Sequence, residues 1–277
     1  MGGVGNLLAV SDLHVGHQVN RDVLRSLRPL AEDDWLLVAG DVAERIEHVE
    51  WAMRVLKRSF SKVIWAPGNH ELWTTPKDES ELRGEARYLE LVERCRALDV
   101  LTPEDPYPTW DGGGEPLTIA PLFTLYDYSY RAEGVSVEEA LKQAYDAGVV
   151  CTDEVYLFPE PYASRAEWCA QRVASTVARL DALAPDQRTV LVSHWPLNPA
   201  PTKRLRYQEF AQWCGTTLTA DWHVRYRAAV AVYGHLHIPL DDVVDEVPFR
   251  EVSLGYPREW QPRSRPHGLP RVILPAV

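Results

Sequence analysis

The chain has 277 residues and a formal net charge of −11, and its 45% hydrophobic and 25% charged residues are typical of a globular protein that can bury a core. No apolar run approaches the roughly 20 residues of a membrane-spanning helix, so we expect no transmembrane segment and no membrane partner. The acidic charge disfavours attraction to nucleic acid and favours a small substrate. The first residues lack a basic or long apolar stretch, which predicts a cytoplasmic protein.

Five short apolar runs predict buried strands. They are rich in Val and Leu without a clean alternation, as in strands of a sheet that helices cover. Each run stops abruptly at a polar cluster, which marks the end of the strand. The runs are 7–10, 35–39, 63–66, 189–192 and 229–233.

Helical patterns lie between the first strands. Asn20 is interpreted as the N-cap of a helix over 22–30, and 46–58 carries apolar residues at helical spacing. Thr75 followed by Pro76 predicts the start of a third helix that reaches about residue 98, because proline is favoured in the first turn. The alternation of strands and helices indicates an α/β protein.

Two capping boxes predict further helices in the second half of the chain. Ser136 with Glu139 precedes a short helix that Gly148 can end, and Ser164 with Glu167 precedes a helix to about residue 183. In each box the serine hydroxyl can accept a hydrogen bond from the backbone N–H three residues later.

The segment from about 101 to 161 is irregular and rich in Pro, Gly and aromatic residues. Because it lies between two clusters of possible metal ligands, we expect a substrate lid inserted into a single domain over 1–277. The alternative is an aromatic loop that only packs on the core.

The C-terminal part shows two patterns. Residues 241–251 alternate in a way that predicts a hairpin or edge strands. The Pro- and Arg-rich tail that follows is expected to wrap around the fold rather than to bind a ligand.

Each predicted strand ends in residues that can bind a metal ion, and the carboxyl ends of strands meet at one edge of an α/β sheet. A single buried histidine is more often structural, but five such endings together indicate a metal centre. Glycine in front of several of them allows close approach of the backbone. The clusters are Asp12-Leu13-His14, Gly40-Asp41, Gly68-Asn69-His70-Glu71, Ser193-His194 and Gly234-His235-Leu236-His237.

The order of these motifs, DxH, GD, GNH, a later His and GHxH, resembles the calcineurin-like metallophosphoesterases. The resemblance covers residues 12 to 237. It implies a four-layer α/β/β/α sandwich of two mixed sheets flanked by helices, with two divalent metal ions. Imidazole, carboxylate and amide donors suit Mn²⁺, which we expect, or Fe, Zn²⁺, Ni²⁺ or Mg²⁺.

The resemblance also implies a role for each motif. Asp41 would bridge the two ions, and His70 would protonate the leaving-group oxygen, with a purely supporting role as the alternative. One ion would be bound by Asp12, His14, Asp41 and His237, and the other by Asp41, Asn69, His194 and His235.

One motif departs from the family pattern. The family often has GDxxD, whose last acid orients the catalytic histidine, but here Glu44 replaces that aspartate. Glu44 either orients His70 or lies at the surface. Arg45 either contacts the phosphate or braces the turn. Weaker candidates for the pocket wall, which could equally be packing residues, are His17, Trp73, Tyr126, Tyr128, Trp195 and Arg258.

The predicted reaction is hydrolysis of a phosphate ester by a hydroxide that bridges the two ions. We expect a phosphomonoester of a small metabolite as substrate. A phosphodiesterase that acts on a cyclic nucleotide or another small diester is the alternative, and a catalytically inactive scaffold is a third reading. The sequence does not indicate an oligomeric state.

Overall fold

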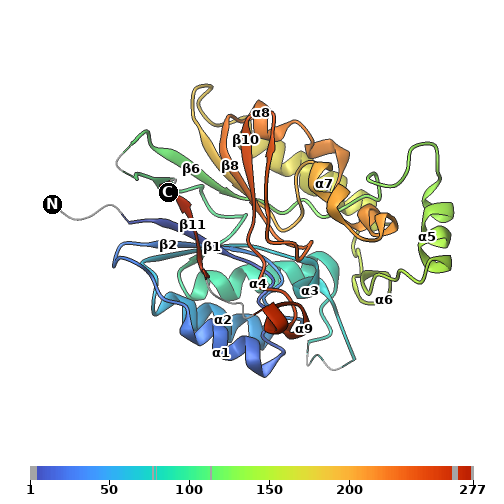
Figure 1. The fold of residues 1–277 in the computed structure, drawn as a ribbon, viewed down its shortest axis with the longest axis horizontal. Coiled ribbons are helices and arrows are strands. Elements are labelled where there is room, and N and C mark those ends of the chain that lie inside the picture. The colour runs from blue at the N-terminus through green and yellow to red at the C-terminus, as the bar shows by residue number, and fades with distance from the viewer. Residues whose placement is uncertain (1–4, 77, 79, 113, 264–267, 276–277) are drawn as a thin grey trace.

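Two sheets pack face to face, with helices on both outer faces, in the computed structural model (Figure 1). The structure describes residues 5–76, 78, 80–112, 114–263 and 268–275. The first sheet has the order β11-β1-β2-β3-β4, in which only β11 is antiparallel to its neighbour. Its strands are β1 Leu7–Val10, β2 Trp35–Ala39, β3 Lys62–Ala66, β4 Val100–Leu101 and β11 Arg271–Leu274.

The second sheet has the order β5-β6-β7-β8-β10-β9, with a parallel centre and an antiparallel strand at each edge. It is therefore mixed, as the first sheet is. Its strands are β5 Thr109–Trp110, β6 Leu117–Pro121, β7 Thr189–Val192, β8 Ala228–Tyr233, β9 Asp241–Val244 and β10 Val247–Glu251.

Successive residues of the central strands face two different cores. In β1, Leu8 packs in the core under the helices, whereas Leu7 packs in the core between the sheets. Leu36 and Leu37 of β2 divide in the same way. Both faces of β1 and β2 are covered, which explains apolar runs without polar alternation.

Helices cover both outer faces, which confirms the predicted four-layer sandwich (Figure 1). The first sheet carries α1 Gln18–Ser26, α2 Ile46–Lys57 and α4 Gly84–Ala97, and the second carries α7 Arg165–Leu180 and α8 Trp222–Arg225. Helices α5 Val137–Asp146 and α6 Asp153–Tyr156 form an arm beside the main body. The remaining helices are α3 Asn69–Leu72, α9 Pro257–Trp260, η1 Ala200–Arg204, η2 Gln208–Trp213, η3 Thr217–Thr219 and η4 Gln261–Arg263.

Ser136 and Ser164, the predicted N-caps of two helices, are confirmed as the caps of α5 and α7. The Oγ atoms of Ser136 and Ser164 each accept a backbone hydrogen bond at 3.1 Å, from Glu139 and Glu167 respectively. Helix α7 ends at Leu180, three residues earlier than the sequence predicted.

Two predicted helix starts are wrong. Asn20 lies inside α1 rather than at its N-cap, because its Nδ2 donates to the carbonyl oxygens of Leu13 and Gly255. Helix α4 begins at Gly84 rather than near Pro76, so a loop precedes it. At Asn20, contacts with residues distant in sequence overrode the local capping signal.

The segment expected as an insertion divides in two. Residues 109–110 and 117–121 form the neighbouring strands β5 and β6 of the second sheet, so the irregular reading is wrong there. The rest, from 122 to 161, includes the α5–α6 arm.

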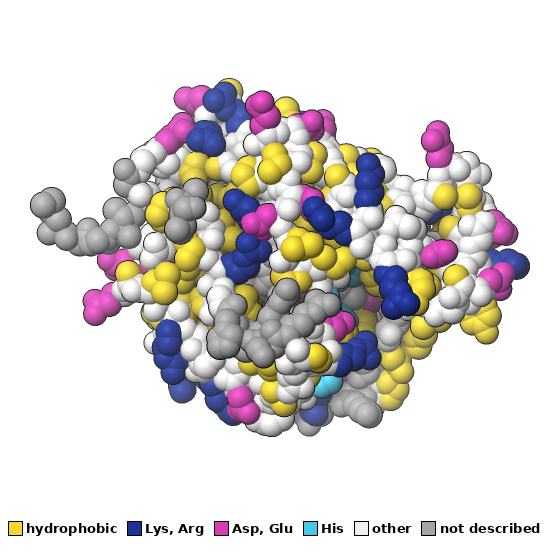
Figure 2. Space-filling model, in the orientation of Figure 1, with side chains coloured by type: hydrophobic (Ala, Val, Ile, Leu, Met, Phe, Trp, Pro, Cys, Tyr) yellow, Lys and Arg dark blue, Asp and Glu magenta, His cyan; other side chains and the backbone are white. Residues whose placement is uncertain are grey.

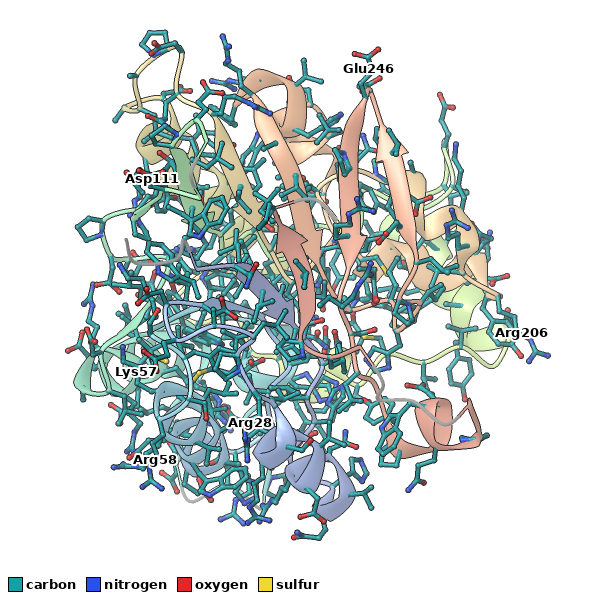
Figure 3. All side chains as sticks on the ribbon, turned by 60° about the vertical axis from the view of Figure 1, so that its left-hand side comes forward. Arg28, Lys57, Arg58, Asp111, Arg206 and Glu246 are labelled. Carbon is teal, nitrogen blue, oxygen red and sulfur yellow. The ribbon has the colours of Figure 1, made fainter. Side chains whose placement is uncertain are left out.

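The predicted C-terminal hairpin is confirmed by β9 and β10, whose turn at Asp245 and Glu246 has positive φ angles of 47° and 66°. Figure 3 shows Glu246 at its tip, pointing into solvent. The tail then crosses to the first sheet, where β11 pairs with β1. None of the helices in the described residues combines the length and apolar character that a bilayer crossing needs.

Candidate metal centre and active site

All seven predicted metal ligands follow strands, and they meet at the carboxyl edge of both sheets. Asp12, His14 and Asp41 come from loops of the first sheet, and Asn69 is the first residue of α3, which follows β3. His194, His235 and His237 come from loops of the second sheet. Four of the seven, Asp41, Asn69, His235 and His237, line a cavity of about 360 Å³. Figure 2 shows a hollow between the main body and the arm, with histidine visible inside and Lys and Arg side chains at its edge.

Five of these seven residues have a left-handed backbone. Such a conformation costs a non-glycine residue about 1–2 kcal/mol, so it persists only where the surroundings fix it. The strand endings therefore turn sharply, and each turn directs a polar side chain into the site. The φ angles are 52° at Asp12, 40° at His14, 52° at Asp41, 71° at His235 and 54° at His237.

Glycines in two of the ligand loops lie very close to the carboxylates of Asp41 and Asp12. A Cβ atom at Gly68 would lie 2.2 Å from Oδ1 of Asp41, and one at Gly234 would lie 2.3 Å from Oδ2 of Asp12. Since real Cβ atoms do not approach so closely, these two positions require glycine. The glycines that precede the ligand motifs thus allow the close approach that the sequence predicted.

One group of nitrogen and oxygen atoms lies around Asp12. Its Oδ1 is 3.0 Å from Nε2 of His237, and that nitrogen is 3.3 Å from Nε2 of His14. The Nδ1–H of His237 donates to Oε2 of Glu259 at 2.7 Å, which directs Nε2 toward the group. These three ligand atoms lie close enough to bind one ion.

A second group lies around Nε2 of His194. This atom is 3.1 Å from Oδ1 of Asn69 and 3.1 Å from Nδ1 of His235. The Nδ1–H of His194 donates to the carbonyl oxygen of Ala39 at 2.8 Å, so Nε2 is left for the group. These three atoms can all act as hydrogen-bond acceptors, and acceptors do not attract one another. A cation bound between them would give each of them a favourable partner in this buried space.

Asp41 lies between the two groups. Its Oδ2 is 3.4 Å from Nε2 of His194 and 3.6 Å from Nε2 of His70. Spacing alone permits two metal groups that contain Asp41, one with His194 and His235 and one with His14 and His70. The arrangement is that of a shared carboxylate, and it also brings His70 within reach of a cation.

Charge is distributed unevenly over the four histidines of the two groups. Burial lowers the pKa of His194, but Asp41 outweighs it and raises the pKa to about 9. Burial likewise opposes protonation of His237, but Asp12 raises its pKa well above the usual value. Without an ion, protons therefore occupy part of the centre. Burial, with neighbouring histidines, lowers the pKa of the other two, His14 and His235, to about 3.

His70 lies beside the two groups, and its ring is fixed from several sides. Its Nδ1 is 3.1 Å from Oε1 of Glu44, and its backbone N–H donates to Oδ1 of Asp41 at 2.9 Å. The ring of Trp73 packs on it with a centroid distance of 3.7 Å. Burial opposes protonation, but Asp41 and Glu44 raise the pKa of His70 above its usual value.

Arg45 does not lie with this group. It is the N-cap residue of α2 and pairs with Glu47, and it is not among the described residues that line the cavity. Of the weaker candidates, Trp73 and Arg258 line the cavity. His17 contacts Tyr256 edge-on, and the others, Tyr126, Tyr128 and Trp195, are buried in the core.

Three residues of the site were not identified from the sequence. Asp153 accepts a hydrogen bond from Nδ2 of Asn69 at 2.9 Å, which turns the amide oxygen toward the second group. Tyr256 and Glu259, from the tail expected only to wrap, line the cavity instead. None of the three lies at the end of a strand with a motif, so local sequence gave no signal for them.

Comparison with known proteins gives a consistent result. The family model described as calcineurin-like phosphoesterase matches residues 5–239. The acyl-carrier-protein phosphodiesterase PptH of Mycobacterium tuberculosis is 53% identical over 276 residues, which cover 99% of this chain and 85% of that protein. The crystal structure of phosphopantetheinyl hydrolase (PptH) from Mycobacterium tuberculosis matches with a TM-score of 0.96 over 99% of this chain and 98% of that one.

Proposed function

Because the chain belongs to the calcineurin-like phosphoesterases, as its motifs predicted, we propose that it hydrolyses a phosphodiester with two divalent ions bound by the seven predicted residues. The prediction of a phosphoester hydrolase is confirmed. The relative from Mycobacterium tuberculosis favours the phosphodiesterase alternative over the phosphomonoesterase that the sequence suggested first. Mn²⁺ is the ion we propose, because imidazole, carboxylate and amide donors suit it.

One observation carries the proposal: Asp41 lies within ligand spacing of His14 in the first group and of His194 and His235 in the second, and it lines the cavity. When bound, a pair of divalent ions lowers the pKa of a water molecule between them and holds the phosphoryl oxygens. Asn69 and Asp153 orient one group, and His237 with Glu259 orients the other.

His70 supplies the acid in the proposed reaction. As an imidazolium it holds a proton on Nε2, which faces the cavity, while Glu44 fixes Nδ1. Departure of an alkoxide from phosphorus requires a proton, and an imidazolium can donate it as the P–O bond breaks. Trp73 restricts the ring to this orientation.

The substrate we propose is a phosphopantetheine group joined to an acyl carrier protein through a phosphodiester, in place of the small phosphomonoester predicted from sequence. The names of the relative and of the similar crystal structure support this substrate. The cavity supports it too, because apolar residues such as Trp73, Leu205 and Phe210 lie beside the polar groups in its wall. Residues 150–152 also line the cavity, which supports a lid role for this part of the central segment.

The test is to incubate the Mn²⁺-loaded protein with phosphopantetheinylated acyl carrier protein and to follow the intact mass of the carrier. We expect the carrier to lose the phosphopantetheine mass, and chelator-treated protein to leave it unchanged. Bis-(p-nitrophenyl) phosphate and p-nitrophenyl phosphate, assayed in parallel, compare diester with monoester. Turnover of the monoester alone would refute the diester proposal, and no turnover by metal-loaded protein would favour the inactive scaffold.

A further inference from the structure

Tyr256 lies over the proposed metal centre, although it follows β10 and lies outside the region that the family model matches. Its ring stacks on His14 with a centroid distance of 4.3 Å and an interplanar angle of 18°. It also meets the ring of His237 at 5.0 Å. The phenol therefore contacts the first ligand group from the side of the cavity, which it helps to line.

The hydroxyl of Tyr256 points to the catalytic histidine. Its oxygen lies 3.3 Å from Nε2 of His70. In the imidazolium form both ring nitrogens donate, so Nδ1–H is directed to Glu44 and Nε2–H to this oxygen. A phenol also has a hydrogen of its own, and the described residues provide no further hydrogen-bond partner for it. That hydrogen is available to a ligand in the cavity.

The position of this hydroxyl is fixed by the turn at the start of α9. The backbone N–H of Tyr256 donates to Oε2 of Glu259 at 2.8 Å, and the N–H of Glu259 donates back to the carbonyl of Tyr256 at 2.8 Å. Trp260 anchors the same turn, because its Nε1 donates to Oδ1 of the buried Asn20 at 3.1 Å. A donor fixed in this way needs little reorganisation when charge develops beside it.

We propose that Tyr256 is a catalytic residue whose hydroxyl donates a hydrogen bond to a non-bridging phosphoryl oxygen of the bound diester. The inference rests on the proposed function. The tyrosine keeps its proton, and no bond to it forms or breaks. In the substrate complex it also accepts Nε2–H of His70, which places the acid beside the phosphorus. As the P–O bond breaks, that proton leaves this contact and passes to the leaving-group oxygen. Negative charge on the phosphoryl oxygens strengthens this contact in the transition state.

The test is Tyr256→Phe, which removes the oxygen and keeps the ring that stacks on His14. In Mn²⁺-loaded protein we expect kcat/KM to fall about 10- to 100-fold for both bis-(p-nitrophenyl) phosphate and the carrier-protein diester. The affinity for inorganic phosphate, measured by calorimetry, should fall as well, while the number of metal ions per chain stays the same. Tyr162→Phe is the matched control, because it removes a hydroxyl that donates to Glu85. Neither residue is among the described residues that line the cavity, so this variant should behave as the wild type does.

Two results would overturn the proposal. Unchanged kcat/KM and phosphate affinity in Tyr256→Phe would show that only the ring matters. A loss confined to the substrate with the poorer leaving group would show that the hydroxyl acts through His70 alone. If the wild type cleaves no diester, the proposed function fails, but phosphate binding to the metal-loaded protein still tests the contact with Tyr256.

Discussion

Oε1 of Glu44 lies 3.1 Å from Nδ1 of His70. The glutamate therefore reaches the histidine that an aspartate contacts in the family motif. Burial opposes ionisation of Glu44, but the hydrogen bond from His70 outweighs it and lowers the Glu44 pKa to about 2. Of the two interpretations left open by the sequence, this geometry favours orientation of His70 over a purely surface position.

Glu44→Gln should lower kcat about 10-fold and change its pH dependence. The two carboxylates raise the pKa of His70, so the acid form persists to higher pH and is lost as pH rises through that pKa. Removing one charge lowers the pKa, and the fall in kcat on the alkaline side should begin at lower pH. Glu47→Gln, in the neighbouring half-buried pair with Arg45, is the control. A wild-type pH profile in Glu44→Gln would contradict the proposed role.

His70→Asn should bind metal as the wild type does and lose about 10²–10⁴-fold in kcat. The loss should be largest for an alkyl leaving group, which needs a proton, and smallest for p-nitrophenolate, which does not. Steady-state rates on both substrates, with metal content by elemental analysis, provide the measurement. Equal rates for variant and wild type would remove His70 from the mechanism.

Asp41→Asn should weaken both ions together, because this side chain lies within reach of both ligand groups. An amide retains one neutral oxygen ligand but loses the negative charge that two cations share. Elemental analysis after dialysis should find fewer than two ions per chain, and activity should fall in parallel. Two tightly bound ions in this variant would show that the bridge is wrongly assigned.

Metal uptake should release protons and become tighter as pH rises. The pKa of His194 is raised to about 9 and that of His237 is also raised, so at neutral pH both carry protons that an ion must displace. The apparent affinity for Mn²⁺ should therefore increase with pH up to about 9. Calorimetry in buffers of different ionisation enthalpy measures the released protons, and a value of zero at pH 7 would contradict these assignments.

Glu259→Gln should weaken metal binding about 10- to 100-fold, as loss of a carboxylate behind a histidine ligand commonly does. Glu259 accepts Nδ1–H of His237 and so fixes the ring with Nε2 toward Asp12. Titration with Mn²⁺ should show one weakened site and one unchanged site. Glu246→Gln, at the exposed tip of the β9–β10 hairpin, is the matched control (Figure 3). Two unchanged sites in Glu259→Gln would reduce Glu259 to a packing residue.

The sequence predicts those parts of the fold that depend on residues adjacent in the chain. Strands β1, β2 and β7 begin and end at the predicted residues, because uninterrupted apolar runs stop at polar clusters there. The ligand residues could be identified because each follows such a strand. Their convergence was inferred from topology, and the structure brings all seven together.

The missed features depend on distant partners. Strand β6 contains Thr118 and ends at Pro121, and only pairing with β5 and β7 makes it a strand. Asp153 and Glu259 are ordinary acids in sequence, and they acquire a role only when folding places them behind Asn69 and His237. A pattern of neighbours along the chain does not contain such contacts.

Each of the two ligand groups draws residues from both sheets, with Asp12 and Asp41 on one side and His237 and His194 on the other. An ion bound in either group would cross-link the two sheets, in addition to its role in the reaction. Ligands that bind only the folded form stabilise it in proportion to their affinity. Removal of the ions by a chelator would therefore lower the free energy of unfolding as well as the activity. The loss of stability would arise where the two sheets meet at the active site.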